Sequence, residues 1–235
     1  MHRITLASAI CILFMMVVSA SGQGLEKPLD ATIGFSERTF EFGFMPAGTT
    51  VMHTFTLRND GSDTLRIIRV KPTCGCTNAP LSKTDLGPGE TADLDVFFDS
   101  RKFKGKVVKK VSILSNDPKD PYSEIAFSAQ IESRHPLLDI DPMVVEADKI
   151  EGGSYRVKLS NTSDESLKLE ILSESAPYVE TKLSRDEVAP GQTADLMVKI
   201  NDNYNEVKNP WYSITIQTND PMQNRVSIPI KLPNK

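Results

Sequence analysis

Cys74 and Cys76 are the residues of this sequence best suited to chemistry, and Gly75 is the one residue between them. In an extended strand, residues i and i+2 point to the same face with Cα atoms roughly 6.5 to 7 Å apart. That separation is at or beyond the limit for a disulfide. Gly75 can adopt backbone angles forbidden to other residues, which would tighten the chain until the sulfurs meet. The resulting bridge would be strained and easily reduced, which suits a redox-active or regulatory pair.

Other roles of this pair stay open from the sequence. Two thiolates on one face form a two-coordinate site for Cu(I), a soft ion that tolerates so few ligands, whereas zinc requires four. The pair also fits a structural bridge, packed thiols or an intermolecular disulfide. A thioredoxin-type oxidoreductase is not expected, because its two cysteines are separated by two residues at a helix N-terminus. The segment 77–80 that follows Cys76 is instead typical of a loop.

Other side chains offer little further chemistry. His53 is predicted to be a partly buried structural residue, and His135 to lie in a linker. The sequence contains neither a phosphate-binding loop nor a nucleophile elbow. We therefore predict no catalytic residue, no cofactor, no resident metal and no enzymatic activity. Four acidic residues lack the spacing of a calcium loop and are predicted to lie in turns and linkers: Asp117, Asp120, Asp139 and Asp141.

An internal repeat contains the elements that position the cysteines. At an offset of 102 residues, Asn59 aligns with Asn161, and Pro88–Leu94 aligns with Pro190–Leu196. Beyond these landmarks the offset becomes 103, because Asn116-Asp117-Pro118 falls on Asn219-Asp220-Pro221. A repeat of this length indicates one duplicated domain and is too long for a solenoid unit.

The duplication predicts two domains, residues 33–132 and residues 137–233. In the second copy, Ala176 and Tyr178 stand where the first copy has Cys74 and Cys76. The repeated fold is therefore expected to form without the cysteines. We expect the pair to have a role that is local to the first domain.

Apolar residues alternate with period two through both copies, which predicts half-buried strands. Residues 92–98 and 125–131 are clear examples, and Asn, Asp, Gly and Pro separate the runs as turn formers. About seven short strands in roughly 100 residues indicate an Ig-like β-sandwich. We predict an all-β protein with two such sandwiches in tandem.

The order of several motifs in the first copy also carries a resemblance to a known family. These motifs are Phe40–Gly43, Leu57–Gly61, Leu65–Val70, Thr73–Thr77, Gly87–Gly89, Phe98-Asp99 and Ser115–Pro118. Together they resemble the bacterial family called domain of unknown function 1573, which looks like the Hydin-like and major-sperm-protein-like Ig modules. The resemblance covers about residues 36–131 and implies an exported Ig-like protein whose activity is not established.

The N-terminus has the pattern of a secretory signal peptide, predicted over residues 1–22. Arg3 precedes an apolar run of about fifteen residues, which is short for a membrane span. Cleavage is expected after Ala20 or after Gly22, and Cys11 would be removed with the peptide. We expect an exported protein of the bacterial periplasm or cell surface, without a transmembrane segment.

Charge argues against one class of partner. Without the signal peptide, 26 Lys and Arg face 31 Asp and Glu, a net charge of −5 that does not fit nucleic-acid binding. We predict a non-enzymatic binding or structural protein of the cell envelope that contacts an envelope protein or a surface polymer. The alternative is a thiol protein that acts in disulfide exchange or Cu(I) binding through Cys74 and Cys76.

Two further features have a structural and a functional interpretation each. The basic run 101–110 is predicted to be a solvated hairpin whose lysines protect a sheet edge. Its alternative role is to bind an anionic partner such as a surface polysaccharide or a lipid head group. Trp211 is predicted to fill the core of the second domain, and the alternative is an exposed binding anchor.

Overall fold

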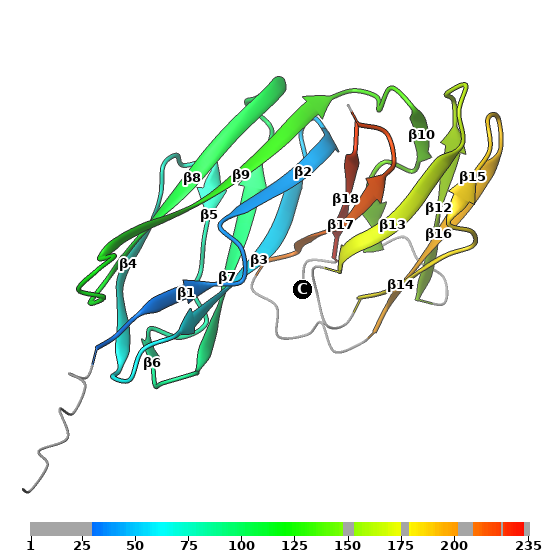
Figure 1. Ribbon diagram of the computed structural model, residues 1–235. Coiled ribbons are helices and arrows are strands. Elements are labelled where there is room, and N and C mark those ends of the chain that lie inside the picture. Colours follow the sequence, from blue (N-terminus) through cyan, green and yellow to red (C-terminus); the bar gives the residue numbers. More distant parts are fainter. Residues whose placement is uncertain (1–29, 148–152, 175–178, 202–208, 222, 233–235) are drawn as a thin grey trace, which may run out of the picture.

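The computed structural model describes residues 30–147, 153–174, 179–201, 209–221 and 223–232. These residues form two β-sandwiches in tandem (Figure 1). The predicted signal peptide lies outside the described residues, as do Ala176 and Tyr178. Within the described residues, no helix is long and apolar enough to cross a membrane.

The first sandwich is built from the strands β1 (Ile33–Phe35), β2 (Thr39–Pro46), β3 (Thr50–Asn59), β4 (Leu65–Pro72), β5 (Thr77–Asn78), β6 (Asp85–Leu86), β7 (Thr91–Asp99), β8 (Gly105–Ser115) and β9 (Tyr122–Glu132). The second is built from β10 (Leu138–Asp141), β11 (Val145–Glu146), β12 (Ser154–Asn161), β13 (Leu167–Glu174), β14 (Val179–Leu183), β15 (Glu187–Val188), β16 (Thr193–Ile200), β17 (Trp211–Thr218) and β18 (Arg225–Lys231).

The repeat predicted from the sequence is confirmed strand by strand. The strands β4 to β7 begin at residues 65, 77, 85 and 91, and β13 to β16 begin at 167, 179, 187 and 193, which is 102 residues later in each case. The period-two pattern is confirmed as well, because Ala92, Leu94, Val96 and Phe98 of β7 are all buried in the first core. Asp139 and Asp141 were predicted in turns or linkers, but they lie within β10, where they point to solvent.

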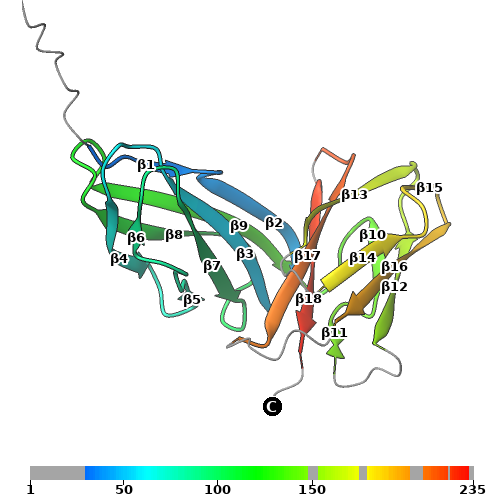
Figure 2. The same ribbon diagram turned by 90° about the horizontal axis from the view of Figure 1, so that it is seen from below.

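Three sheets form the two sandwiches, and one sheet is shared. The strand orders β1-β3-β7-β5 and β10-β12-β16-β14 give one layer of each sandwich. The opposite layers join into a ten-stranded sheet with the order β15-β13-β17-β18-β2-β9-β8-β4-β6, and β11 pairs with β18. The join is a parallel contact between β18 and β2 at Val226 and Phe44. Figures 1 and 2 show β17 and β18 on the side of the second sandwich that faces the first, beside β2 and β3.

Hydroxyl side chains of β17 and β18 bind the backbone of the first sandwich at this junction. The Ser213 hydroxyl donates to the Met52 carbonyl over 2.6 Å and accepts from the Met52 amide over 3.0 Å. The Ser227 hydroxyl donates to the Phe42 carbonyl over 2.7 Å. Met52 and Phe44 are buried in the core of the second sandwich. The two sandwiches therefore share a sheet, hydrogen bonds and apolar packing.

Candidate functional site

Cys74 and Cys76 lie in the connection between β4 and β5, where the chain crosses from one layer of the first sandwich to the other. The structure joins the two sulfurs in a disulfide, with the Cα atoms 5.2 Å apart. A turn brings them together, since the Thr77 amide donates to the Cys74 carbonyl over 3.4 Å. Gly75 is not among the glycines with positive φ, so this turn closes without a left-handed glycine.

Backbone contacts fix this turn to two neighbouring strands. The amide and the hydroxyl of Thr73 both donate to the Lys110 carbonyl in β8, each over 3.1 Å. The Asp99 amide in β7 donates to the Cys76 carbonyl over 2.9 Å. The turn is thus anchored on both layers of the sandwich, with the disulfide between its two anchors.

The disulfide lies at the surface, between solvent, one buried hydroxyl and the core of the first sandwich. Both cysteines are partly exposed, and the space where a Gly75 side chain would point is open. Thr77 is buried, and its hydroxyl oxygen lies 3.5 Å from Cys74 Sγ and 3.8 Å from Cys76 Sγ. Cys76 also packs against the core of the first sandwich. Sequence reasoning included Thr77 in a motif but assigned it no role, although a hydroxyl directly after the second cysteine was the available signal.

The second repeat makes the same crossing between layers. Its strands β13 and β14 end at Glu174 and begin at Val179, so four residues connect them, as four residues connect β4 and β5. Ala176 and Tyr178 replace the cysteines in this connection. The flanking strands form in both repeats, and the disulfide is therefore not a requirement of the sandwich.

Replacing both cysteines with serine should lower the free energy of unfolding by no more than about 1.5 kcal/mol. A disulfide stabilises mainly by restricting the unfolded chain, and a bridge between residues two apart closes a very short loop. Urea denaturation of the wild type and of the Cys74→Ser, Cys76→Ser double variant measures the difference. A loss above about 3 kcal/mol would identify the bridge as a structural staple instead.

The two histidines occupy structural positions. His53 is buried, stacks on Phe40 with ring centroids 3.5 Å apart, and forms a hydrogen bond of 2.6 Å from Nε2 to Glu37. Its burial lowers the pKa of His53 despite this carboxylate. His135 lies in the linker between β9 and β10, as predicted, and is 5% exposed. Across the described residues, no group of three or more His, Cys, Asp or Glu side chains is arranged to hold a metal ion.

The basic run 101–110 is not a hairpin. Residues 100–104 connect β7 to β8, which lie in different layers of the sandwich, so the prediction of a hairpin is wrong. The predicted protection of a sheet edge applies to the first half of β8. The strand β4 pairs with residues 111–115 only, so residues 105–109 have β9 on one side and form a sheet edge on the other. Lys109 Nζ lies 4.1 Å from the ring centroid of Phe103, which packs against the core.

Trp211 does not fill the core. It is partly buried, lies outside the core cluster of the second sandwich, and has Lys231 Nζ 5.8 Å from its ring centroid. The prediction of a core position is therefore wrong. The aromatic residue that enters this core is its neighbour Tyr212.

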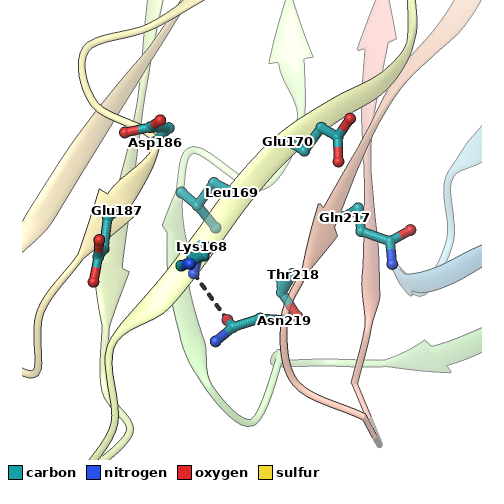
Figure 3. Close-up of a pocket in the computed structure, with 8 residues that line it drawn as sticks. All are labelled: Lys168, Leu169, Glu170, Asp186, Glu187, Gln217, Thr218 and Asn219. Carbon is teal, nitrogen blue, oxygen red and sulfur yellow. Dashed lines mark hydrogen bonds between the residues drawn. The ribbon is translucent and has the colours of Figure 1, made fainter.

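An open groove of about 610 Å³ lies in the second sandwich among β13, β15 and β17, with the lining residues drawn in Figure 3. In it, the Asn219 side chain accepts from the Lys168 amide over 2.8 Å and donates to the Ser166 carbonyl over 3.2 Å. Asn116 makes the equivalent pair of bonds in the first repeat. The groove thus contains a scaffold feature that both repeats share.

The outer face of β4, β8 and β9 is the second candidate site. Tyr122 and Val108 project from it and are 77% and 60% exposed. They share this face with Lys106 and Lys110, because residues two apart along β8 point the same way. Arg69 and Lys71 of β4 pair with Leu114 and Ser112 and extend the face, and Glu124 forms an ion pair of 2.8 Å with Lys110. This outer face is basic and bears large exposed apolar side chains.

Comparison with known proteins gives the following similarities. No curated protein matches the chain. Among solved structures, similarity is found to a protein of unknown function from Porphyromonas gingivalis W83, with 13% identity over 86% of this chain and 99% of that chain and a TM-score of 0.36. The ASH/PapD-like domain of human CEP192 gives 14% identity over 51% and 99%, with a TM-score of 0.37. The periplasmic chaperone SfaE gives 10% identity over 87% and 100%, with a TM-score of 0.34.

The family comparison covers the repeat that contains the disulfide. Residues 33–131 match the sequence model of a family described as "Protein of unknown function (DUF1573)". This range contains the strands β1 to β8 and nearly all of β9, and with them the Cys74–Cys76 turn. The similarity to the DUF1573 family therefore falls on the first sandwich of this chain.

Proposed function

We propose that this chain is an exported, non-enzymatic binding or structural protein of the bacterial cell envelope. Its two domains would comprise residues 33–132 and 137–233, after removal of a signal peptide. The observation that carries the proposal is the outer face of β4, β8 and β9, where Tyr122 and Val108 are 77% and 60% exposed. Both lie on this one face, six residue pairs apart along β8 and β9, and exposed apolar surface rimmed by polar residues marks interaction sites in soluble proteins.

Charge on this face favours an acidic partner. Lys106 and Lys110 flank Val108 along β8, Arg69 and Lys71 of β4 lie on the same face, and Glu124 is paired with Lys110. A basic face attracts anionic surfaces and speeds their encounter with the protein. We therefore expect an acidic envelope protein or an anionic surface polymer to bind here, with Tyr122 as an aromatic anchor.

A photo-crosslinking side chain at position 122 tests this proposal in cells of the source bacterium. We expect an adduct of defined size, because Tyr122 would lie inside the contact. The matched control has the same crosslinker at Leu172, an exposed apolar position of the second sandwich that is 38% exposed. Equal adducts at both positions, or none at 122, would reject this face as the binding surface.

Thiol chemistry at Cys74 and Cys76 is the second candidate function, and the partly exposed disulfide favours it. Between its two variants, the structure supports exchange better than Cu(I) binding. The sulfur that binds a metal is a thiolate, whereas a disulfide is itself the substrate of thiol exchange.

A further inference from the structure

We propose that the Cys74–Cys76 disulfide accepts electrons from a dithiol, and that the Thr77 hydroxyl stabilises the thiolate that leaves in this exchange. The inference rests on the second candidate function and is independent of the proposed binding face. Its substrate class is a pair of cysteine thiols on a partner protein of the same compartment. Three features of the first repeat support the proposal: the sulfurs are accessible, the fold does not depend on the disulfide, and the Thr77 hydroxyl lies beside both sulfurs.

Access is the first requirement, since an attacking thiolate must reach a sulfur. Both cysteines are partly exposed, and the tip of the turn at Gly75 has open space beside it. The bonds that attach the turn to Lys110 and Asp99 come from Thr73 and from the Cys76 carbonyl and involve neither sulfur. Cys76 packs against the core on one side only in part, since it stays partly exposed. A thiolate can therefore approach while the sandwich stays folded.

Tolerance of the reduced state is the second requirement. The bridge spans two residues, so its loss releases little chain entropy. The backbone bonds of Thr73, Cys76 and Thr77 hold the turn independently of the sulfurs. The second repeat makes the same four-residue crossing without cysteines. Reduction is therefore expected to leave the fold intact, which a reversible exchange site needs.

Thr77 supplies the third feature. It is 8% exposed, yet its hydroxyl lies 3.5 Å from Cys74 Sγ and 3.8 Å from Cys76 Sγ, within hydrogen-bond reach of both. Whichever sulfur leaves becomes a thiolate next to this donor. Exchange is faster when the leaving thiolate is more stable, and hydrogen bonds to charged groups are stronger than those to neutral groups.

The reaction balances with the dithiol as the only reductant. One partner thiolate attacks one sulfur, forms a mixed disulfide, and breaks the Cys74–Cys76 bond, so that the other cysteine leaves as a thiolate. The second partner thiol then attacks the partner sulfur of the mixed disulfide and releases the remaining cysteine. Two electrons and two protons pass to this chain, which becomes a dithiol, and the partner becomes a disulfide.

Dithiothreitol is the probe for the test, used on the chain without residues 1–22 so that Cys11 is absent. Aliquots taken at successive times are alkylated with N-ethylmaleimide, and mass spectrometry gives the number of labels on each chain. Circular dichroism follows the fold in parallel. We expect no label before reduction, two labels after it, and an unchanged fold. The rate at which dithiothreitol reduces the disulfide should be about tenfold lower in Thr77→Val than in the wild type, because a hydrogen bond to the leaving thiolate is lost.

Two matched variants separate a chemical role of Thr77 from a packing role. Thr77→Ser keeps the hydroxyl and should keep most of the reduction rate. Thr73→Val removes a hydroxyl that does not contact the sulfurs, while the Thr73 amide keeps its bond to the Lys110 carbonyl, so the turn should stay anchored and the rate unchanged. Equal rates for wild type and Thr77→Val would overturn the role of Thr77 while exchange stands. A disulfide that dithiothreitol reduces only when the chain unfolds would overturn exchange itself.

Discussion

Replacing Gly43 with alanine is expected to lower the free energy of unfolding by about 3 kcal/mol. Gly43 has a φ of 64°, a left-handed conformation that costs other residues about 1 to 2 kcal/mol. A Cβ atom there would also collide with the backbone carbonyl of Arg225 in β18, and a strand backbone cannot swing aside as a side chain does. Because β2 meets β18 here, the variant should also loosen the junction between the sandwiches. Urea unfolding followed by circular dichroism measures the loss.

Gly48 provides a matched control for this substitution. Its φ is 78°, but nothing lies within 4 Å of where its Cβ would be. Gly48→Ala should therefore carry only the backbone penalty of about 1 kcal/mol. The fluorescence of Trp211, in the strand β17 at the junction, should change with Gly43→Ala and not with Gly48→Ala. Equal losses of stability in the two variants would contradict the collision with Arg225.

The strands could be predicted from the sequence because each depends on a local pattern. Alternation in β7 places Leu94 and Val96 inside, and burial of an apolar face fixes the register of such a strand. The duplication reinforced the prediction, since the same pattern recurs 102 residues later in β16. The fold class therefore followed from side-chain periodicity and turn formers, and the repeat followed from the alignment of the two halves.

The junction between the sandwiches could not be predicted in the same way. It depends on contacts between segments far apart in sequence, such as Ser213 with Met52, which are 161 residues apart. One local signal was nevertheless present. Met52 and Phe97 are apolar at positions where β3 and β7 otherwise point polar side chains outward, and both enter the core of the second sandwich. Apolar residues out of phase with their strand are typical of a second contact surface.

The repeated asparagines show a similar limit. Asn59 and Asn161 were identified as landmarks and interpreted as turn formers, but both are 1% exposed. The side-chain amide of Asn59 donates to the carbonyls of Asp63 and Leu86, and the side chain of Asn161 makes the equivalent pair of bonds in its own repeat. The residue type alone indicates a turn, because asparagine favours turns. Only the tertiary structure identifies the carbonyl 27 residues away that makes this asparagine a buried cross-link.

The candidate site was predictable in its residues and not in its geometry. The spacing of Cys74 and Cys76 limited the pair to a small set of roles. The sequence could not supply the turn closed by Thr77, because the turn depends on anchors in β7 and β8. The basic run illustrates the same point, since a run of charge indicates exposure and carries no information about which strands pair.

Stability is expected to fall by about 3 kcal/mol between pH 6.5 and pH 4 because of His135 alone. Burial lowers the pKa of His135 from 6.5 to about 4, although the charges of Asp220 and Glu132 act to raise it. The neutral ring is needed because Nδ1 accepts from the amides of Leu137 and Leu138, over 3.2 and 3.0 Å. As the pH falls below 6.5, the unfolded chain binds a proton that the folded chain excludes. The stabilisation by neutral His135 is therefore complete above pH 6.5 and is lost as the pH falls to about 4.

His135→Asn isolates this effect, because asparagine offers an acceptor and does not titrate. Urea denaturation at a series of pH values should show a shallower decline in the variant than in the wild type, while His53 and the carboxylates contribute equally to both. The ring of His135 lies edge-on to Phe44, with centroids 5.2 Å apart, and Phe44 belongs to the core of the second sandwich. Protonation should thus act at the junction, and the fluorescence of Trp211 should respond before the far-UV signal does. Parallel declines in the two proteins would show that His135 is not the group responsible.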